Sequence, residues 1–160
     1  MSYAENTSVS SEKSRGEIEA TLLRYGADQF MYGWDASGAV IQFRASNRHV
    51  RFVLPMPDRE DPKFHRTPSG RRQRSSDDAL KAWEQETRRR WRALALAIKA
   101  KLEVVASGIA TFEDEFLAAI VIPGGETVGE WLAPQIEEAY SSGKMLESMR
   151  LALPGAGETS

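Results

Sequence analysis

The longest periodic stretch of the sequence runs from about residue 77 to residue 106 and predicts a single long helix. The side chains that define the period recur at steps of three and four: Leu80, Trp83, Thr87, Trp91, Leu94, Ile98, Leu102 and Val105. That spacing places them on one face of an α-helix about 45 Å long. Ser75 and Ser76 offer an N-cap, and Asp77 and Asp78 suit the positive end of the helix dipole. The stripe predicts a core-facing helix, with Trp83 and Trp91 inside the core.

The same stretch and the loop before it hold most of the positive charge. Residues 63–101 contain 12 Lys and Arg against four Asp and Glu, which leaves nine against 19 in the rest of the chain. Lys81, Arg88, Arg92 and Lys99 fall within about 20° of one line along the helix, about 110° from the centre of its apolar stripe. Segregation of this kind is typical of a nucleic-acid site, and the overall net charge of −2 hides it.

Two interpretations of this basic stretch remain open. In the first, it neutralises phosphates of nucleic acid, which is DNA or RNA and single-stranded or duplex, with little dependence on base sequence. The predicted contacts are Arg71, Arg72, Arg74, Lys81, Arg88, Arg92 and Lys99. In the second, the basic face is simply solvated or meets an acidic protein surface, on another protein or on a second copy in a homo-oligomer.

The rest of the chain predicts one α+β domain over residues 13–142. Ser14 and Glu17 form a capping-box pattern that opens a first helix, which Gly26 can close. Alternating apolar residues then predict three strands, at about 30–34, 39–43 and 50–54, in an antiparallel meander. A long basic loop is expected at 55–75 and a helical C-terminal piece at 111–142, where Pro134 is expected to kink or divide the last helix. Residues 1–12 and most of 143–160 are expected to be disordered.

The second face of the predicted sheet is only half polar. It carries Arg44 and Arg51, with Arg48 beside them. These three cations predict either an ordinary solvated face or a secondary contact for a phosphate backbone or an oligomer neighbour.

Little in the sequence indicates catalysis. There is no Cys, and the two histidines, His49 and His65, lack metal-ligand spacing. No nucleophile elbow, phosphate loop or pair of catalytic acids stands out. We therefore expect no enzyme activity, no cofactor and no metal ion. The sequence has no run of 18 apolar residues, so it predicts no membrane span. The lack of Cys suits the reducing cytoplasm.

Two blocks of sequence, SEKSRGEIEATLLRYGA and WRALALAIKAKLEVVASGIATFEDEFLAAIVIP, resemble an uncharacterised family of proteins carried by bacteriophages, prophages and other mobile elements. The resemblance spans about residues 8–140 and brings no catalytic residue. It implies an accessory protein in the bacterial host cytoplasm that manages phage DNA or inhibits a host defence complex. The element order is also similar to double-stranded-RNA-binding domains and to single-strand annealing proteins. The long loop and the missing lysine signature depart from the RNA-binding motif.

Overall fold

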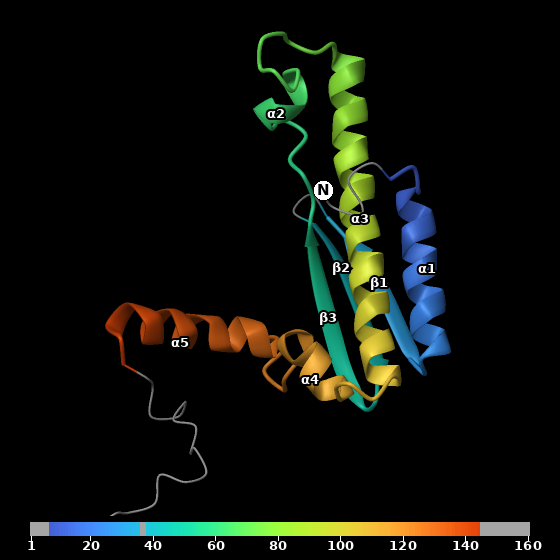
Figure 1. Ribbon diagram of the computed structural model, residues 1–160, viewed down its shortest axis with the longest axis vertical. Coiled ribbons are helices and arrows are strands. Elements are labelled where there is room, and N and C mark those ends of the chain that lie inside the picture. Colours follow the sequence, from blue (N-terminus) through green and yellow to red (C-terminus); the bar gives the residue numbers. More distant parts are fainter. Residues whose placement is uncertain (1–6, 36–37, 145–160) are drawn as a thin grey trace, which may run out of the picture.

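A computed structural model describes residues 7–35 and 38–144, and it confirms the predicted α+β fold (Figure 1). The elements in chain order are α1 (Ser11–Arg24), β1 (Gln29–Trp34), β2 (Gly38–Ala45), β3 (Arg48–Pro55), α2 (Pro62–His65), α3 (Ser76–Ala106), α4 (Phe112–Phe116), the 3-10 turn η1 (Leu117–Ala119) and α5 (Val128–Ser142). The disorder predicted for residues 1–6 and 145–160 lies outside the described residues.

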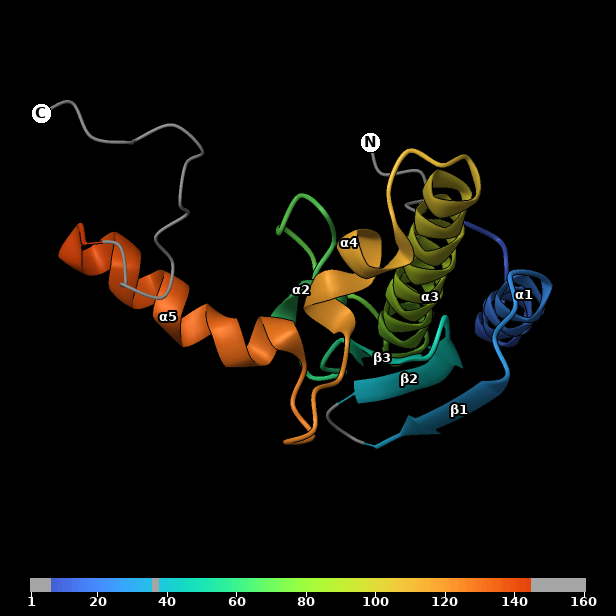
Figure 2. The same cartoon turned by 90° about the horizontal axis from the view of Figure 1, so that it is seen from below.

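The three strands form an antiparallel sheet in the order β1-β2-β3. Two residues join β2 to β3, and both Ser46 and Asn47 have left-handed backbones, with φ of 50° and 58°. This conformation matches the twist of the flanking strands, so it fixes the register of the hairpin. Helices α1 and α3 lie over one face of the sheet, and no helix of the described residues lies against the other (Figure 2). We call the uncovered side the open face.

The core forms between the covered face and the two helices. It contains Ile18 and Leu22 of α1, Trp91, Ile98 and Leu102 of α3, and Ile41, Phe43 and Val50 of the sheet. In this core, every second residue of the strands packs against helix residues that are spaced three or four positions apart. Trp91 is 2% exposed, as its place on the predicted stripe requires.

Helix α3 is much longer than the sheet. Its 31 residues span about 46 Å, whereas an eight-residue strand spans about 26 Å, so roughly 20 Å of helix extends past the strands. The segment after β3 covers this extension instead (Figure 1). Phe64 is buried, and the Trp83 indole N–H donates to the carbonyl of Pro57 at 2.7 Å. Trp83 is therefore half-buried against this segment rather than in the main core.

The first helix begins earlier than the sequence pattern predicts. Ser10 is its N-cap and accepts a hydrogen bond from the Lys13 N–H at 3.1 Å, so the predicted capping box at Ser14 is wrong. Ser14 is fully buried one turn inside the helix. Several serines precede the apolar face, and starting one turn earlier places a small side chain where α1 packs. The predicted end at Gly26, with φ of 91°, is confirmed.

The C-terminal helices attach to the edge of β3. An isolated bridge pairs Val50 with Ile120, and the Val121 N–H donates to the carbonyl of His49 at 2.8 Å. A capping box between Thr127 and Glu130 opens α5, which continues through Pro134 without being divided. Helix α5 leads away from the body, and none of its side chains is buried (Figures 1 and 2). Within the described part of the chain, no helix is both long and apolar enough to cross a membrane.

Candidate nucleic-acid interface

The segment predicted as a loop contains a short helix followed by a tight hairpin. Asp61 caps α2 by accepting the Lys63 N–H at 3.0 Å, and Pro62 occupies the first helical turn. Residues 65–74, which we call the basic hairpin, then fold back on themselves. The Thr67 N–H donates to the Arg72 carbonyl at 2.9 Å, and a further bridge pairs Arg66 with Gln73.

The turn of the basic hairpin is built from Thr67-Pro-Ser-Gly70. The Gly70 N–H donates to the Thr67 carbonyl at 2.7 Å, and Gly70 has a left-handed φ of 71°. Pro68 presets the second position of such a turn, and Gly70 accepts the positive φ. Residues 62–76 hold five Lys and Arg and no Asp or Glu. The hairpin therefore presents concentrated positive charge on a hydrogen-bonded backbone.

Arg74 anchors the hairpin and is not free to bind a ligand. Its guanidinium donates to the carbonyls of Lys63 and Phe64, at 3.4 and 3.2 Å. Its backbone N–H also donates to the His65 carbonyl at 2.8 Å. Among the predicted contacts, Arg74 is thus committed to holding the hairpin against α2.

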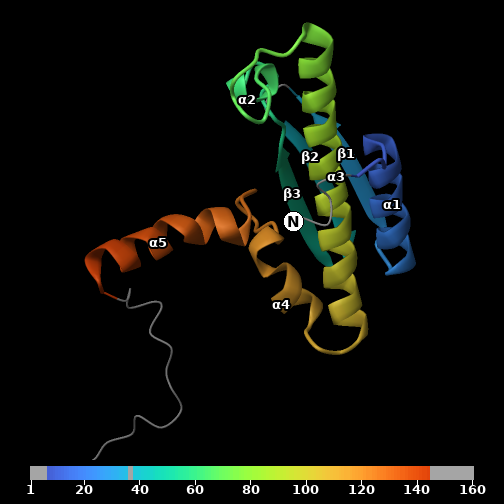
Figure 3. The ribbon, with the colours of Figure 1, turned by 45° about the horizontal axis from the view of Figure 1, so that its top comes forward.

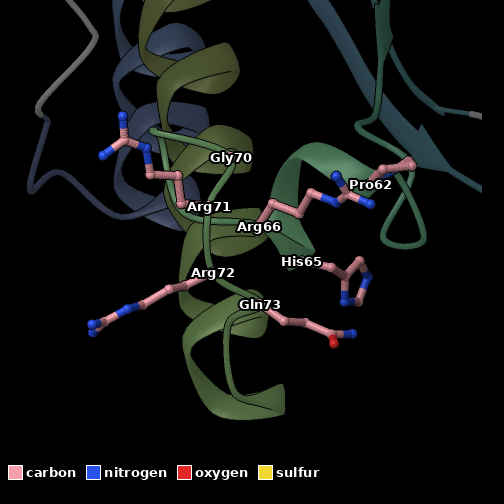
Figure 4. Close-up of a pocket in the computed structure, with 7 residues that line it drawn as sticks. All are labelled: Pro62, His65, Arg66, Gly70, Arg71, Arg72 and Gln73. Atoms are coloured by element: carbon pink, nitrogen blue, oxygen red, sulfur yellow. The ribbon is translucent and has the colours of Figure 1, made fainter.

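The arginines near the tip are exposed and spread apart. Pro62, His65, Arg66, Gly70, Arg71, Arg72 and Gln73 line a shallow hollow of about 370 Å³. Figure 4 shows Arg66 pointing to one side of the hairpin, with His65 and Gln73, while Arg71 and Arg72 point to the other. Within the described residues, these three guanidinium groups have no hydrogen-bond or ion-pair partner. The positive charges therefore flank the hairpin instead of converging on one point.

The predicted stripe on α3 divides into engaged and free cations. Arg92 pairs with Glu17 of α1, and Arg88 donates to the Gln85 side-chain oxygen at 2.7 Å. Lys81 and Lys99 are exposed and have no partner in the described ranges. They lie 18 residues apart, about 27 Å along the axis. Lys81 is close to the hairpin end of α3, whereas Lys99 lies on the half that covers the sheet.

Next to the stripe, the carboxylate of Glu86 accepts hydrogen bonds from two arginines. Glu86 accepts from Arg89 at 2.7 Å and from Arg90 at 3.0 Å, and these hydrogen bonds lower the pKa of Glu86 to about 2. Arg90 also donates to the Pro55 carbonyl. Arg90 thus links α3 to the end of β3, while Arg88 and Arg89 donate to side chains of α3 itself.

The predicted secondary contact set is paired within the chain. Arg44 donates to Asp28 at 2.8 Å and thereby holds the pKa of that carboxyl below its usual value. Arg48 pairs with Glu113 of α4, and Arg51 pairs with Glu130 of α5 at 2.8 Å. These arginines join the sheet to its neighbouring elements.

Sequence reasoning left Arg66, an exposed cation of the basic hairpin, out of the contact set. Arg66 was counted in the basic stretch, but nothing in its spacing marked it as a contact. The Thr67-Pro-Ser-Gly70 turn signature was the available signal, because a hairpin there brings Arg66 beside Gln73 and close to Arg72.

Residues 7–35 and 38–144 contain no cluster of three or more His, Cys, Asp or Glu that could hold a metal ion. No protein-family model matches the chain, and searches of curated proteins and of solved structures found no match. Arg66, Arg71, Arg72 and Lys81 are exposed and have no partner within the described residues, so these four cations form the candidate interface, at one end of the molecule.

Proposed function

We propose that this chain is a non-enzymatic accessory protein that binds the phosphate backbone of nucleic acid through the basic hairpin and Lys81. The observation that carries the proposal is an ordered hairpin whose exposed guanidinium groups have no acidic residue within 62–76 to neutralise them. The resemblance to proteins of phages and mobile elements suits a role in managing DNA.

The spread of the arginines favours a polymer over a small anion. A single phosphate is held best by groups that converge, whereas Arg66 and Arg71 point to opposite sides of the hairpin (Figure 4). An extended backbone offers a phosphate every few ångströms and can meet both sides. Backbone contacts carry no base information, so binding is expected to depend little on sequence.

The aromatic residues near the hairpin favour duplex over single strand. Single-strand binders stack bases on exposed aromatic rings. Phe64 is buried beneath Lys63, and Trp83 donates its indole N–H to Pro57. Neither ring is presented beside the exposed arginines, so we expect phosphate contacts to dominate.

Fluorescence anisotropy with labelled duplex and single-stranded oligonucleotides tests the proposal. With about four phosphates neutralised, raising salt from about 50 to 200 mM should weaken duplex binding by roughly 100-fold. Replacing Arg71 and Arg72 with Ala should weaken binding at least about tenfold and reduce the slope of log affinity against log salt by about two.

The matched control removes the same charge elsewhere. Arg24→Ala with Lys144→Ala takes two exposed cations from α1 and from the end of α5, and it should bind like the wild type. If both double variants behave alike, bulk charge and not the hairpin governs binding. An absence of oligonucleotide binding at 50 mM salt would refute the proposal and favour an acidic protein surface as the ligand of the hairpin.

A further inference from the structure

The basic hairpin is a short two-stranded ribbon whose turn is accessible to a large ligand. Two backbone hydrogen bonds cross it, from the Thr67 N–H to the Arg72 carbonyl at 2.9 Å and from the Arg74 N–H to the His65 carbonyl at 2.8 Å. Residues 68–73 are all exposed. The hairpin lies at the end of the molecule where α3 begins, so its turn can reach a ligand without the sheet (Figures 1 and 2).

The cations of this ribbon lie on its two faces and not at its tip. Figure 4 shows Arg66 and Gln73 on one side of the hairpin and Arg72 on the other. The pairing explains this arrangement, because residues 66 and 73 form one cross-strand pair and the next pair, 67 and 72, faces the opposite way. The tip, residues 68–70, is Pro-Ser-Gly and has no charge. Positive groups therefore flank a narrow, uncharged end.

The thickness of the ribbon matches one groove of one kind of duplex. Stacked sheets lie about 10 Å apart, so a single β-layer with side chains on both faces is about 10 Å thick. The major groove of B-form DNA is about 12 Å wide, whereas its minor groove is about 6 Å wide. The major groove of duplex RNA is deep and too narrow for side chains to read. The dimensions therefore favour the major groove of DNA.

The acidic residues nearest to the hairpin in the sequence favour an approach by the tip. Asp61 is the N-cap of α2, and Asp77 lies in the first turn of α3. Neither belongs to the ribbon itself, and residues 62–76 contain no Asp or Glu. An approach by the tip brings the cations to the phosphates ahead of these two carboxylates, whereas an approach by the base of the hairpin would bring all of them together.

We propose that the basic hairpin enters the major groove of duplex DNA by its tip, with Arg66 on the phosphates of one strand and Arg71 and Arg72 on those of the other. The inference rests on the proposed function and narrows its ligand from nucleic acid to B-form DNA. The groove is about 8.5 Å deep, which equals two to three residues of strand, so the turn reaches the base edges while the arginines face the bordering phosphates. Ser69 places at the tip a hydroxyl that can bond either donors or acceptors, so base sequence should matter little.

Duplex DNA and duplex RNA of the same sequence, each about 20 base pairs long, separate groove entry from simple attraction to phosphate. Contacts to the phosphates alone would hold the two duplexes about equally. Fluorescence anisotropy at about 100 mM salt should show at least tenfold tighter binding to DNA, because only its major groove admits the ribbon. Equal affinities would overturn the inference and leave phosphate binding by the hairpin standing. Binding to neither duplex would overturn the proposed function as well.

Filling one groove at a time identifies the groove that receives the hairpin. Cytosines that carry a glucosylated hydroxymethyl group at C5 fill the major groove, and netropsin fills the minor groove of A·T pairs. Both treatments leave the phosphates in place. The modified cytosines should weaken binding at least about tenfold, whereas netropsin should change it less than about threefold. The reverse pattern would place the hairpin in the minor groove, against the proposal.

Two variants with the same added charge test whether the tip leads. Ser69→Asp places a carboxylate at the tip, and Ser75→Asp places one at the N-cap of α3, and aspartate suits both the turn and the cap. Ser69→Asp should weaken binding to duplex DNA about tenfold, because its carboxylate would lie between two rows of phosphates, whereas Ser75→Asp should weaken it at most about threefold. Far-UV circular dichroism checks that both variants are folded. Equal losses would show that the tip does not enter the groove.

Discussion

Glu86 is the carboxylate most strongly perturbed by its neighbours among the described residues. Its side chain is 17% exposed, and Arg89 and Arg90 both donate to it. Replacing Glu86 with Gln leaves two guanidinium groups facing an uncharged amide. We expect Glu86→Gln to lower the free energy of unfolding by about 1–2 kcal/mol at pH 7. Urea denaturation of the two proteins measures the difference.

The pH dependence of that difference follows from the sign of the shift. The folded pKa of Glu86 is about 2, below its ordinary 4.5, so the unfolded chain takes up the proton first as the pH falls. The stabilisation is therefore fully present above pH 4.5 and is lost between 4.5 and 2. The gap between wild type and Glu86→Gln should close over that window. A gap that stays constant down to pH 2 would show that the arginines do not stabilise the charged form.

Which arginines of the site are exposed and which are bonded within the chain was its least predictable feature. Arg72 and Arg74 are two residues apart in the same acid-free run, yet Arg72 is exposed and Arg74 binds two carbonyls. Periodicity places a residue on a face of a helix, but it does not say which carboxylate another element brings to it. Arg92 illustrates this, because its partner Glu17 lies 75 positions away in the sequence.

At the scale of elements, hydrophobic period predicted the three strands and α3 to within a few residues. The agreement is good because these elements face one core, so burial and local pattern require the same side chains. Pattern failed for α2 and the basic hairpin. These elements cover the end of α3 that extends past the sheet. Whether such a cover is required depends on the relative lengths of α3 and the strands, which a local hydrophobic period does not show.

Phe64 is the main apolar contact that fixes the hairpin region to α3, so Phe64→Ala tests whether order in this region matters. Removing a buried phenylalanine ring should destabilise this region by about 3 kcal/mol, while the main core between the sheet and the helices stays intact. All the cations remain, but their positions are no longer fixed. Trypsin should then cleave after Arg71 and Arg72 faster, and oligonucleotide affinity should fall several-fold.

A matched change separates order from general stability. Leu102→Ala removes a similar apolar contact from the main core, far from the hairpin. It should lower the melting temperature without speeding early cleavage at the hairpin. If Phe64→Ala leaves both the cleavage rate and the affinity unchanged, the hairpin is held by its backbone hydrogen bonds alone.

Over the whole molecule, folding pairs many basic side chains with acidic residues that are distant in the sequence. Arg92 pairs with α1, Lys101 with Glu115, and the open-face arginines with Asp28 and Glu130. Many cations near the body are thereby neutralised, whereas Arg66, Arg71 and Arg72 of the hairpin form no ion pair within the described residues, although Asp61 and Asp77 flank the hairpin in the sequence. The basic end and α5 extend from the same body in different directions (Figures 1 and 3).

Two tryptophans report how stability is distributed between the body and α5. Trp91 is 2% exposed and contacts Tyr32 edge-on, so Trp91→Ala should lower the free energy of unfolding by about 3–5 kcal/mol at any protein concentration. Trp131 is 50% exposed on α5, so Trp131→Ala should lower the free energy of unfolding by less than about 1 kcal/mol. Urea denaturation of the two variants measures both changes, and a loss for Trp131→Ala as large as that for Trp91→Ala would contradict the exposure of Trp131.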